Sequence, residues 1–298
     1  MSMPQRRIGQ FTVSALGLGA MPVSIGPQGA VERDRAIATI HAALDAGITL
    51  VDTADIYAPS WDTMGHNEEL VAEALRGWDG PRDQIVVATK GGITRGEGET
   101  WGRDGSAKYL RQAVEKSLRL LEVEAIDLYY WHRPDRSRPY AEGVEVLAQL
   151  KDEGKIREAG VSNANVEELR VAEEVLGEGG LAAVQNEFSP KFNHTSMAEL
   201  TWCGKHGVAF LPWSPLGGTG GGAASLATRY PAIAELAEQR GISPQQAVLA
   251  WELALGEHVI PIPGASRPES IINSAAAATI ELSADEVATI SRAVNLPE

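Results

Sequence analysis

Four residues have side chains that together could donate a proton to an oxygen that gains negative charge: Asp52, Tyr57, Lys90 and His132. The ordinary pKa of tyrosine, about 10, is too high for an efficient acid at neutral pH. A lysine ammonium nearby would favour the tyrosinate and lower that pKa, and an aspartate would hold the lysine charged and oriented. A histidine could share the developing charge through a hydrogen bond. Each residue alone is also common in turns and cores, so the hypothesis depends on the fold.

Eight short apolar runs recur along the chain, and Asp52, Lys90 and His132 each lie at or beside the end of one. Most runs are nearly continuous stretches with Val, Ile or Leu, which is typical of strands buried on both faces of a parallel sheet. Eight such strands predict an α/β fold of the (β/α)8 TIM-barrel class. The predicted strands span residues 16–21, 49–53, 85–90, 126–132, 157–163, 182–188, 208–213 and 259–263.

The segments between these runs have apolar residues at the i, i+3, i+4 spacing of amphipathic helices, and a glycine follows most of them. We expect one barrel domain over residues 1–298, with an N-terminal hairpin (7–13) that plugs the bottom and an extra C-terminal helix (284–293). The step between the last two strands is the longest, and we attribute its excess to a flexible segment, 217–222. The other predicted helices span residues 35–46, 68–76, 108–121, 144–152, 166–176, 197–206 and 244–255.

Polar residues end six of the eight predicted strands. In barrels of this class the active site forms at the carboxyl ends of the strands. We therefore expect these side chains to converge on one pocket. They are Asp52, Lys90, His132, Ser162 with Asn163, Gln185 with Asn186, and Trp213 with Ser214.

On these residues the sequence resembles the aldo-keto reductase family, in its bacterial form, from about residue 8 to residue 273. The resemblance rests on Asp-Thr-Ala-x-x-Tyr at 52–57, on the strand-terminal Lys90 and His132, and on Gly-Val-Ser-Asn at 160–163, Gln-Asn at 185–186 and Ser-Pro-Leu at 214–216. It implies an NADPH-dependent oxidoreductase that reduces aldehydes or ketones to alcohols. Tyr57 would be the general acid, Lys90 and Asp52 would tune it, and His132 would be its partner.

A nicotinamide cofactor would be bound without a Rossmann fingerprint, because Gly17-Leu18-Gly19 lacks a third glycine at the required spacing. The resemblance implies a cofactor extended across the barrel mouth, with Trp213 stacked on the nicotinamide ring. The glycine-rich segment 218–222 could close over the pyrophosphate or be a plain linker. The residues that the resemblance places at the cofactor are Gly19, Ala20, Met21, Ser162, Asn163, Gln185, Trp213, Ser214, Leu216, Gly217, Ser266, Arg267, Ser270 and Asn273.

The choice between NADPH and NADH depends on Arg267. With Ser266 at a predicted helix N-terminus, it would bind the adenosine 2′-phosphate by charge and by the helix dipole. Many family members have Lys-Ser where this chain has Ile262-Pro263, which removes one expected cation. We therefore expect NADPH, with NADH also accepted.

Three large aromatic residues, Trp61, Trp101 and Trp131, lie in the predicted loops and strand ends that would line the substrate pocket. They would suit an aromatic or aliphatic aldehyde. The chain ends soon after its last helix, so we expect an open pocket and a broad range of carbonyl substrates.

Two other functions are compatible with a barrel. Some family members are cofactor-binding regulatory subunits of channels with little turnover, which the retained four residues disfavour. A metal-dependent barrel hydrolase would need clustered histidine and carboxylate ligands. The six histidines are scattered, and only His132 ends a strand, so we expect no metal site.

The composition limits the partners. The net charge is −14, from 40 acidic against 26 basic residues, which disfavours nucleic acid and anionic membranes as partners. No apolar run approaches the ~20 residues that span a bilayer. The one cysteine, Cys203, cannot form an internal disulfide, which fits a reducing compartment, and we expect it to fill the core. We expect a soluble cytoplasmic protein and, in the absence of any assembly signal, a monomer.

Overall fold

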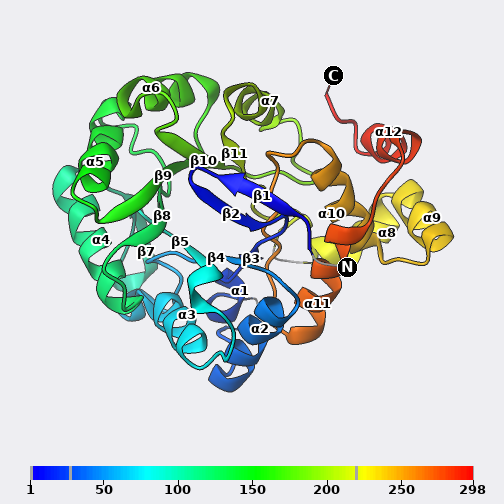
Figure 1. The fold of residues 1–298 in the computed structure, drawn as a ribbon, viewed down its shortest axis with the longest axis horizontal. Coiled ribbons are helices and arrows are strands. Elements are labelled where there is room, and N and C mark those ends of the chain that lie inside the picture. The colour runs from blue at the N-terminus through cyan, green and yellow to red at the C-terminus, as the bar shows by residue number, and fades with distance from the viewer. Residues whose placement is uncertain (1–2, 27–28, 219–220, 298) are drawn as a thin grey trace.

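Seven parallel strands form most of a closed ring. The computed structural model describes residues 3–26, 29–218 and 221–297. The strands pair in the order β11-β10-β9-β8-β5-β4-β3, and helices surround them (Figure 1). They are β3 (Leu18–Gly19), β4 (Leu50–Asp52), β5 (Val86–Gly91), β8 (Ile126–Trp131), β9 (Ile156–Ser162), β10 (Leu181–Gln185) and β11 (Ala209–Phe210).

Residues 259–264 close the ring between β11 and β3 without forming a regular strand. Parallel bridges join Val259 to Phe210 and Gly264 to Gly19, and the backbone N–H of Gly19 donates to the carbonyl of Pro263 at 3.1 Å. The segment also contains Pro261. Because proline has no backbone N–H, two positions of this segment cannot donate to a ladder. The predicted (β/α)8 barrel is confirmed, but its eighth strand is irregular, and β3 and β11 are shorter than predicted.

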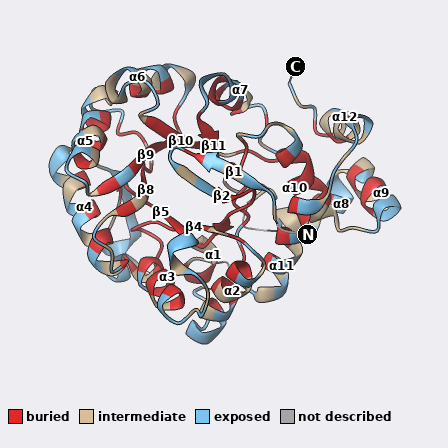
Figure 2. Ribbon diagram, in the orientation of Figure 1, coloured by how far each residue is buried: buried red, intermediate tan, exposed pale blue. Residues whose placement is uncertain are grey.

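Eight helices cover the outside of the ring, with their buried faces toward the strands (Figure 2). The bounds of α6 and α7 match the prediction at both ends. Asn165 caps α6 in a capping box with Glu168, and Gly207 ends α7 at a φ of 68°, so both ends have a local signal. These helices are α2 (Arg33–Asp45), α3 (His66–Arg76), α4 (Ala107–Leu120), α5 (Tyr140–Asp152), α6 (Val166–Leu176), α7 (Met197–His206), α10 (Pro244–Ala254) and α11 (Pro268–Ala276).

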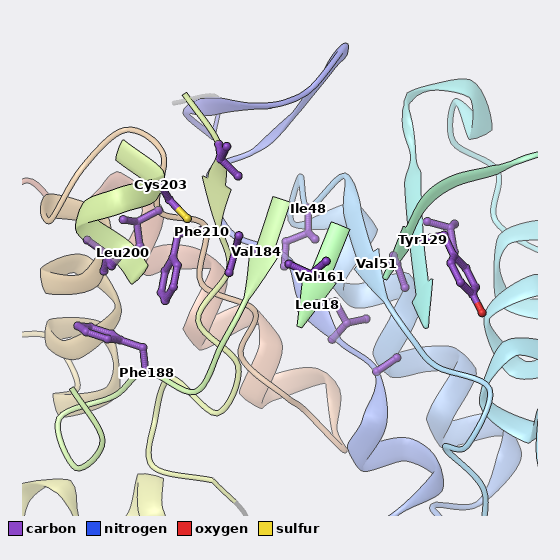
Figure 3. Close-up of a cluster of buried hydrophobic side chains, with 14 of the residues drawn as sticks. Leu18, Ile48, Val51, Tyr129, Val161, Val184, Phe188, Leu200, Cys203 and Phe210 are labelled. Atoms are coloured by element: carbon purple, nitrogen blue, oxygen red, sulfur yellow. The ribbon is translucent and has the colours of Figure 1, made fainter. Parts of the chain in front are cut away.

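The strands separate two apolar layers. Alternate residues of a strand face opposite sides, so Leu128 and Tyr130 of β8 pack inside the barrel whereas Tyr129 and Trp131 pack between strands and helices. Figure 3 shows part of the outer layer, where Cys203 and other side chains of α7 meet the ring. Cys203 is fully buried there, as predicted.

The hairpin predicted at the bottom of the barrel is present as β1 (Gln5–Ile8) and β2 (Phe11–Ser14), and it lies across the ring in Figure 1. Its apolar side chains join the interior layer. Glu158 of β9 accepts hydrogen bonds from the backbone and the side chain of Gln10, at 2.9 and 3.2 Å. The hairpin is therefore fastened to the barrel wall by packing and by a buried carboxylate.

Two parts of the fold were not predicted. A second hairpin, β6 (Ile93–Gly96) with β7 (Thr100–Arg103), follows β5; all four residues of β7 are exposed, so it has no apolar pattern. Between β11 and the closing segment lie α8 (Gly222–Arg229) and α9 (Pro231–Arg240). The excess length was attributed to a flexible segment over 217–222, and this was wrong: the two helices make up most of it, and Gly222 already belongs to α8. Residues 219 and 220 of that segment lie outside the described part of the chain.

The remaining elements are short or terminal. The C-terminal helix α12 has the predicted bounds and opens with the capping box of Ser283 and Glu286. No helix among the described residues is both long and apolar enough to cross a membrane. These elements are α1 (Met21–Ser24), η1 (Trp61–Thr63), η2 (Arg82–Gln84), η3 (Glu97–Glu99), η4 (Ala277–Thr279) and α12 (Ala284–Ala293).

Candidate active site

A buried lysine is the centre of the polar cluster. The Nζ of Lys90 donates to Oδ1 of Asp52 at 2.5 Å, to the carbonyl of Thr53 at 2.7 Å and to the hydroxyl oxygen of Tyr57 at 3.4 Å. Lys90 is 0% exposed and Asp52 is 2% exposed. Each donor of the ammonium therefore has an acceptor, which a buried charge requires.

The strands position these residues through their alternation. Within β4 and β5, Leu50, Val86 and Ala88 point into the barrel. Asp52 and Lys90 stand two residues further along the same faces, and β4 pairs with β5 in parallel register. Both side chains therefore emerge at the carboxyl end of the interior.

Charge and burial together set the protonation of the cluster. Burial alone would lower the pKa of Lys90, but the Asp52 carboxylate and the Tyr57 hydroxyl outweigh it and raise that pKa. Burial raises the pKa of Tyr57 above its ordinary value, and Lys90 only partly offsets this. The expectation that Lys90 brings the pKa of Tyr57 below its ordinary value is thus wrong for this structure. Desolvation of the tyrosinate is the larger effect, so Tyr57 is held as a neutral hydroxyl.

His132 continues the inward face of β8. Its ring lies edge-on to that of Tyr57, with 5.8 Å between the ring centroids, and its backbone N–H donates to the carbonyl of Gly91 at 2.8 Å. Burial lowers the pKa of His132 well below its ordinary value, and the charges of Lys90 and Arg133 lower it further. The imidazole is therefore neutral, with one N–H able to donate.

A cavity of about 710 Å³ opens above these side chains at the barrel mouth. Its wall brings together the polar ends of five of the six predicted strands. Lys90 lies behind Tyr57 and does not line it. The predicted site residues in its wall are Gly19, Met21, Asp52, Tyr57, Trp101, His132, Ser162, Asn163, Gln185, Trp213, Ser214 and Leu216.

Trp131, Trp61 and Ala20 are among the predicted residues that do not line the cavity. Trp131 is 1% exposed and stacks on Tyr140, 5.0 Å between ring centroids, in the layer outside the barrel. Its place in the substrate pocket was wrong, because it occupies an outward-facing position of β8. Trp61 is 39% exposed in η1, away from the cavity wall. Ala20 is fully buried, and its N–H donates to the carbonyl of Asp52.

Hydrogen bonds connect three predicted cofactor residues of the cavity wall with Asp52 and His132 of the catalytic cluster. The side-chain amide of Gln185 donates to Oδ2 of Asp52 at 2.8 Å, and the hydroxyl of Ser162 donates to the carbonyl of Gln185 at 2.7 Å. Asn163, at a φ of 60°, donates its amide to the carbonyl of His132 at 3.0 Å. Gln185 therefore helps to hold Asp52, a role that the sequence analysis missed.

The N-terminal turn of α3 supports the cluster from behind. The side chain of Asn67 is fully buried; its oxygen accepts from the hydroxyl of Thr53 at 2.6 Å, and its amide donates to the carbonyl of Ala20 at 2.9 Å. The backbone N–H of Asn67 donates to the carbonyl of Tyr57 at 3.1 Å. Glu68 accepts from Thr89, beside Lys90, at 2.7 Å. The only indication of Asn67 and Glu68 in the sequence was their position at the start of a helix, about ten residues after Tyr57.

The cavity wall continues towards a run of backbone that lacks bulky side chains. Ser214, Gly217 and Gly218 have φ values of 54°, 90° and 80°, and Gly217 also borders a smaller adjoining cavity of about 100 Å³. Beyond the wall residue Gly264 comes the first turn of α11. This strip of small residues, half-buried at Ser214, Gly217 and Gly218, leaves room for an extended ligand such as a dinucleotide.

The first turns of α11 contain the other predicted cofactor residues. The exposed Arg267 donates its Nε to the hydroxyl of Ser270 at 2.8 Å, beside the half-buried Ser266. Asn273 already donates to Ser243 at 3.1 Å. Over the described ranges, no three histidine, cysteine, aspartate or glutamate side chains are grouped so as to hold a metal ion.

Comparison with known proteins agrees with this geometry. The model of the Aldo/keto reductase family matches residues 15–295. A probable aldo-keto reductase of Glycine max is 33% identical, over 95% of this chain and 86% of its own length. The 6-dehydroglucose reductase of Novosphingobium aromaticivorans is 36% identical, over 88% of this chain and 87% of its own.

Solved structures show the same fold. An aldo/keto reductase from Klebsiella pneumoniae, in complex with NADP and acetate, superposes with a TM-score of 0.82 at 30% identity, over 100% of this chain and 97% of its own. The glycerol dehydrogenase of Gluconobacter oxydans superposes with a TM-score of 0.82 at 29% identity, over 100% of this chain and 98% of its own. The chain therefore belongs to the aldo/keto reductase family of oxidoreductases.

Proposed function

We propose that this protein is an NADPH-dependent reductase that converts aldehydes or ketones to alcohols, with Tyr57 as the general acid. One observation carries the proposal: Tyr57 and the neutral His132 line the cavity side by side, and the buried ammonium of Lys90 lies behind the tyrosine hydroxyl. This arrangement places a proton donor and a hydrogen-bond donor where a carbonyl oxygen would gain charge.

Side chains of this protein bind the carbonyl oxygen of the substrate and transfer a proton to it. Bound NADPH would supply the hydride. The hydroxyl of Tyr57 donates its proton to the carbonyl oxygen as that oxygen gains negative charge, and His132 orients the same oxygen through its N–H. The ammonium of Lys90 stabilises the tyrosinate that is left, until water returns its proton. Asp52 keeps the lysine charged and in place.

The cofactor residues are proposed on the shape of the cavity and on the NADP-bound relative from Klebsiella pneumoniae. The nicotinamide would lie on Trp213, with its carboxamide near Ser162, Asn163 and Gln185. The pyrophosphate would lie against the backbone of 214–217. The adenosine end would be held by Ser266, Arg267, Ser270 and Asn273.

The alternative of a regulatory subunit with little turnover has no support in the relatives described above, which are named for reductase or dehydrogenase activity. The complete hydrogen-bonded cluster around Lys90 also favours turnover. Reduction of a simple carbonyl with NADPH is the direct test.

Replacing the proton donor tests the role of Tyr57. We expect Tyr57→Phe to bind NADPH with unchanged affinity and to lose about 10²- to 10⁴-fold in kcat for 4-nitrobenzaldehyde, since only the acid is removed. Steady-state NADPH oxidation and a fluorescence titration of NADPH measure the two quantities. The control is Tyr140→Phe, a half-buried tyrosine outside the cavity that should retain wild-type kcat. Wild-type turnover by Tyr57→Phe would exclude the assignment.

The pKa directions predict the pH dependence. The pKa of Tyr57 lies above its ordinary value of 10.0 and that of His132 lies well below 6.5, so the acid form of the tyrosine and the neutral form of the histidine are both complete from about pH 7 to pH 9. We expect the single-turnover rate of NADPH oxidation, measured by stopped flow, to be flat over this range. A change of this rate near neutral pH in wild type that is absent in His132→Gln would contradict the prediction, because it would show that His132 titrates there.

Arg267 tests the choice of cofactor. Its guanidinium would make a charge-assisted bond to the 2′-phosphate, so we expect Arg267→Ala to raise the KM for NADPH roughly 10- to 100-fold and to leave the KM for NADH nearly unchanged. Arg292→Ala, an exposed arginine of α12, is the matched control. Equal increases for NADPH and NADH would mean that Arg267 does not contact the 2′-phosphate.

A further inference from the structure

Among the described residues, three charged side chains line the cavity: Asp52, Arg103 and Arg133. The ammonium of Lys90 balances Asp52, so the wall retains the two guanidinium groups. The chain as a whole has a net charge of −14. The cavity is therefore a locally positive site on an acidic protein. The net charge of the protein is negative, so the positive charge of the cavity wall comes from these two side chains alone and not from the molecule as a whole.

Arg133 directly follows His132 and is half-buried. Its guanidinium carbon lies 5.9 Å from the ring centroid of Trp213. Burial and the charge of Arg103 lower the pKa of Arg133, and Glu187 opposes them without approaching to ion-pair distance. Among the described residues Arg133 has no ion pair and no side-chain hydrogen bond. The protein therefore desolvates part of a cation that no described carboxylate pairs with and no described group hydrogen-bonds.

The hairpin that the sequence analysis missed holds Arg103. Arg103 of β7 pairs with Ile93, another wall residue, at the base of the hairpin, and the N–H of the next residue, Asp104, donates to the carbonyl of Gly92 at 3.0 Å. At the other end of the hairpin, Arg95 donates to the carbonyl of Ala58, next to Tyr57, at 2.6 Å. These bonds fix the backbone of the hairpin relative to the segment that holds Tyr57, and the exposed side chain of Arg103 has no ion pair within the described chain.

We propose that Arg103 and Arg133 form an anion subsite, and that the substrate has a carboxylate or phosphate group in addition to its carbonyl. The proposal rests on the reductase function proposed above. The carbonyl oxygen would lie at Tyr57 and His132, and the anionic group would lie between the two guanidinium groups. An anion there relieves the repulsion between two like charges and accepts charge-assisted hydrogen bonds from both.

A matched pair of substrates tests the subsite. 4-Carboxybenzaldehyde and methyl 4-formylbenzoate present the same carbonyl and differ in one negative charge. We expect wild type to favour the acid about tenfold or more in kcat/KM, mainly through KM. Arg133→Gln and Arg103→Gln should each lower this acid-to-ester ratio by about tenfold. Arg170→Gln removes the same charge from the exposed face of α6 and should keep the wild-type ratio.

An acid-to-ester ratio that is the same in wild type and in both cavity variants would overturn the subsite. So would a raised Kd for NADPH with an unchanged ratio, because the two arginines would then serve the phosphates of the cofactor. If wild type reduces neither aldehyde, the reductase proposal fails. Binding of 4-carboxybenzaldehyde, measured by quenching of tryptophan fluorescence, then tests the subsite. Weaker binding by the two cavity variants than by wild type supports it, and equal binding refutes it.

Discussion

The buried ammonium of Lys90 is the constraint on which the site depends. A cation with no access to water is stable only when its donors meet acceptors, and here they meet Asp52, Thr53 and Tyr57. One of the acceptors comes from β4 and the other two come from the loop after it, so the ion pair fixes β5 against β4 and the bond to Tyr57 sets the place of the tyrosine. Asp52 is in turn held by Gln185 from the opposite side of the ring. The cluster therefore joins distant parts of the barrel mouth.

The barrel supplies this geometry through the alternation of its strands. Leu50 precedes Asp52, Ala88 precedes Lys90, and Tyr130 precedes His132, each by two residues on the inward face. The same burial that lets apolar residues fill the interior also desolvates the polar residues at its upper end. Desolvation keeps Tyr57 protonated and His132 neutral, and both are the forms that can donate to a carbonyl oxygen.

Much of this could be predicted from the sequence, where the signal is local. The bounds of α6 and α7 were predicted at both ends from their apolar period and from the glycines that follow them, Gly177 and Gly207. Asp52, Lys90 and His132 end apolar runs, and seven of the eight runs contain a strand. The role of Trp131 was predicted wrongly because its type was considered and its position was not. One residue before His132, it points out of the barrel.

The features that could not be predicted from the sequence depend on burial and contacts in the folded protein. The direction of the pKa of Tyr57 is decided by how much burial opposes Lys90, and no spacing encodes that. The hairpin β6–β7 is exposed and has no apolar period, yet it places Arg103 in the cavity. The sequence of the closing segment, 259–264, predicts a strand. Its two prolines, however, lack the backbone N–H groups that a regular strand would donate. The helices α8 and α9 are short, and proline at the first turn of α9 separates them.

We propose that Asp52 and Lys90 act on catalysis as one unit. A double-mutant cycle of Asp52→Asn and Lys90→Met tests this, with the single-turnover rate of NADPH oxidation as the readout and circular dichroism to verify folding. We expect strong non-additivity: the double variant should be little slower than either single variant, because the first substitution already disables the pair. Effects that multiply, so that the double variant is slower by the product of the two single losses, would contradict it.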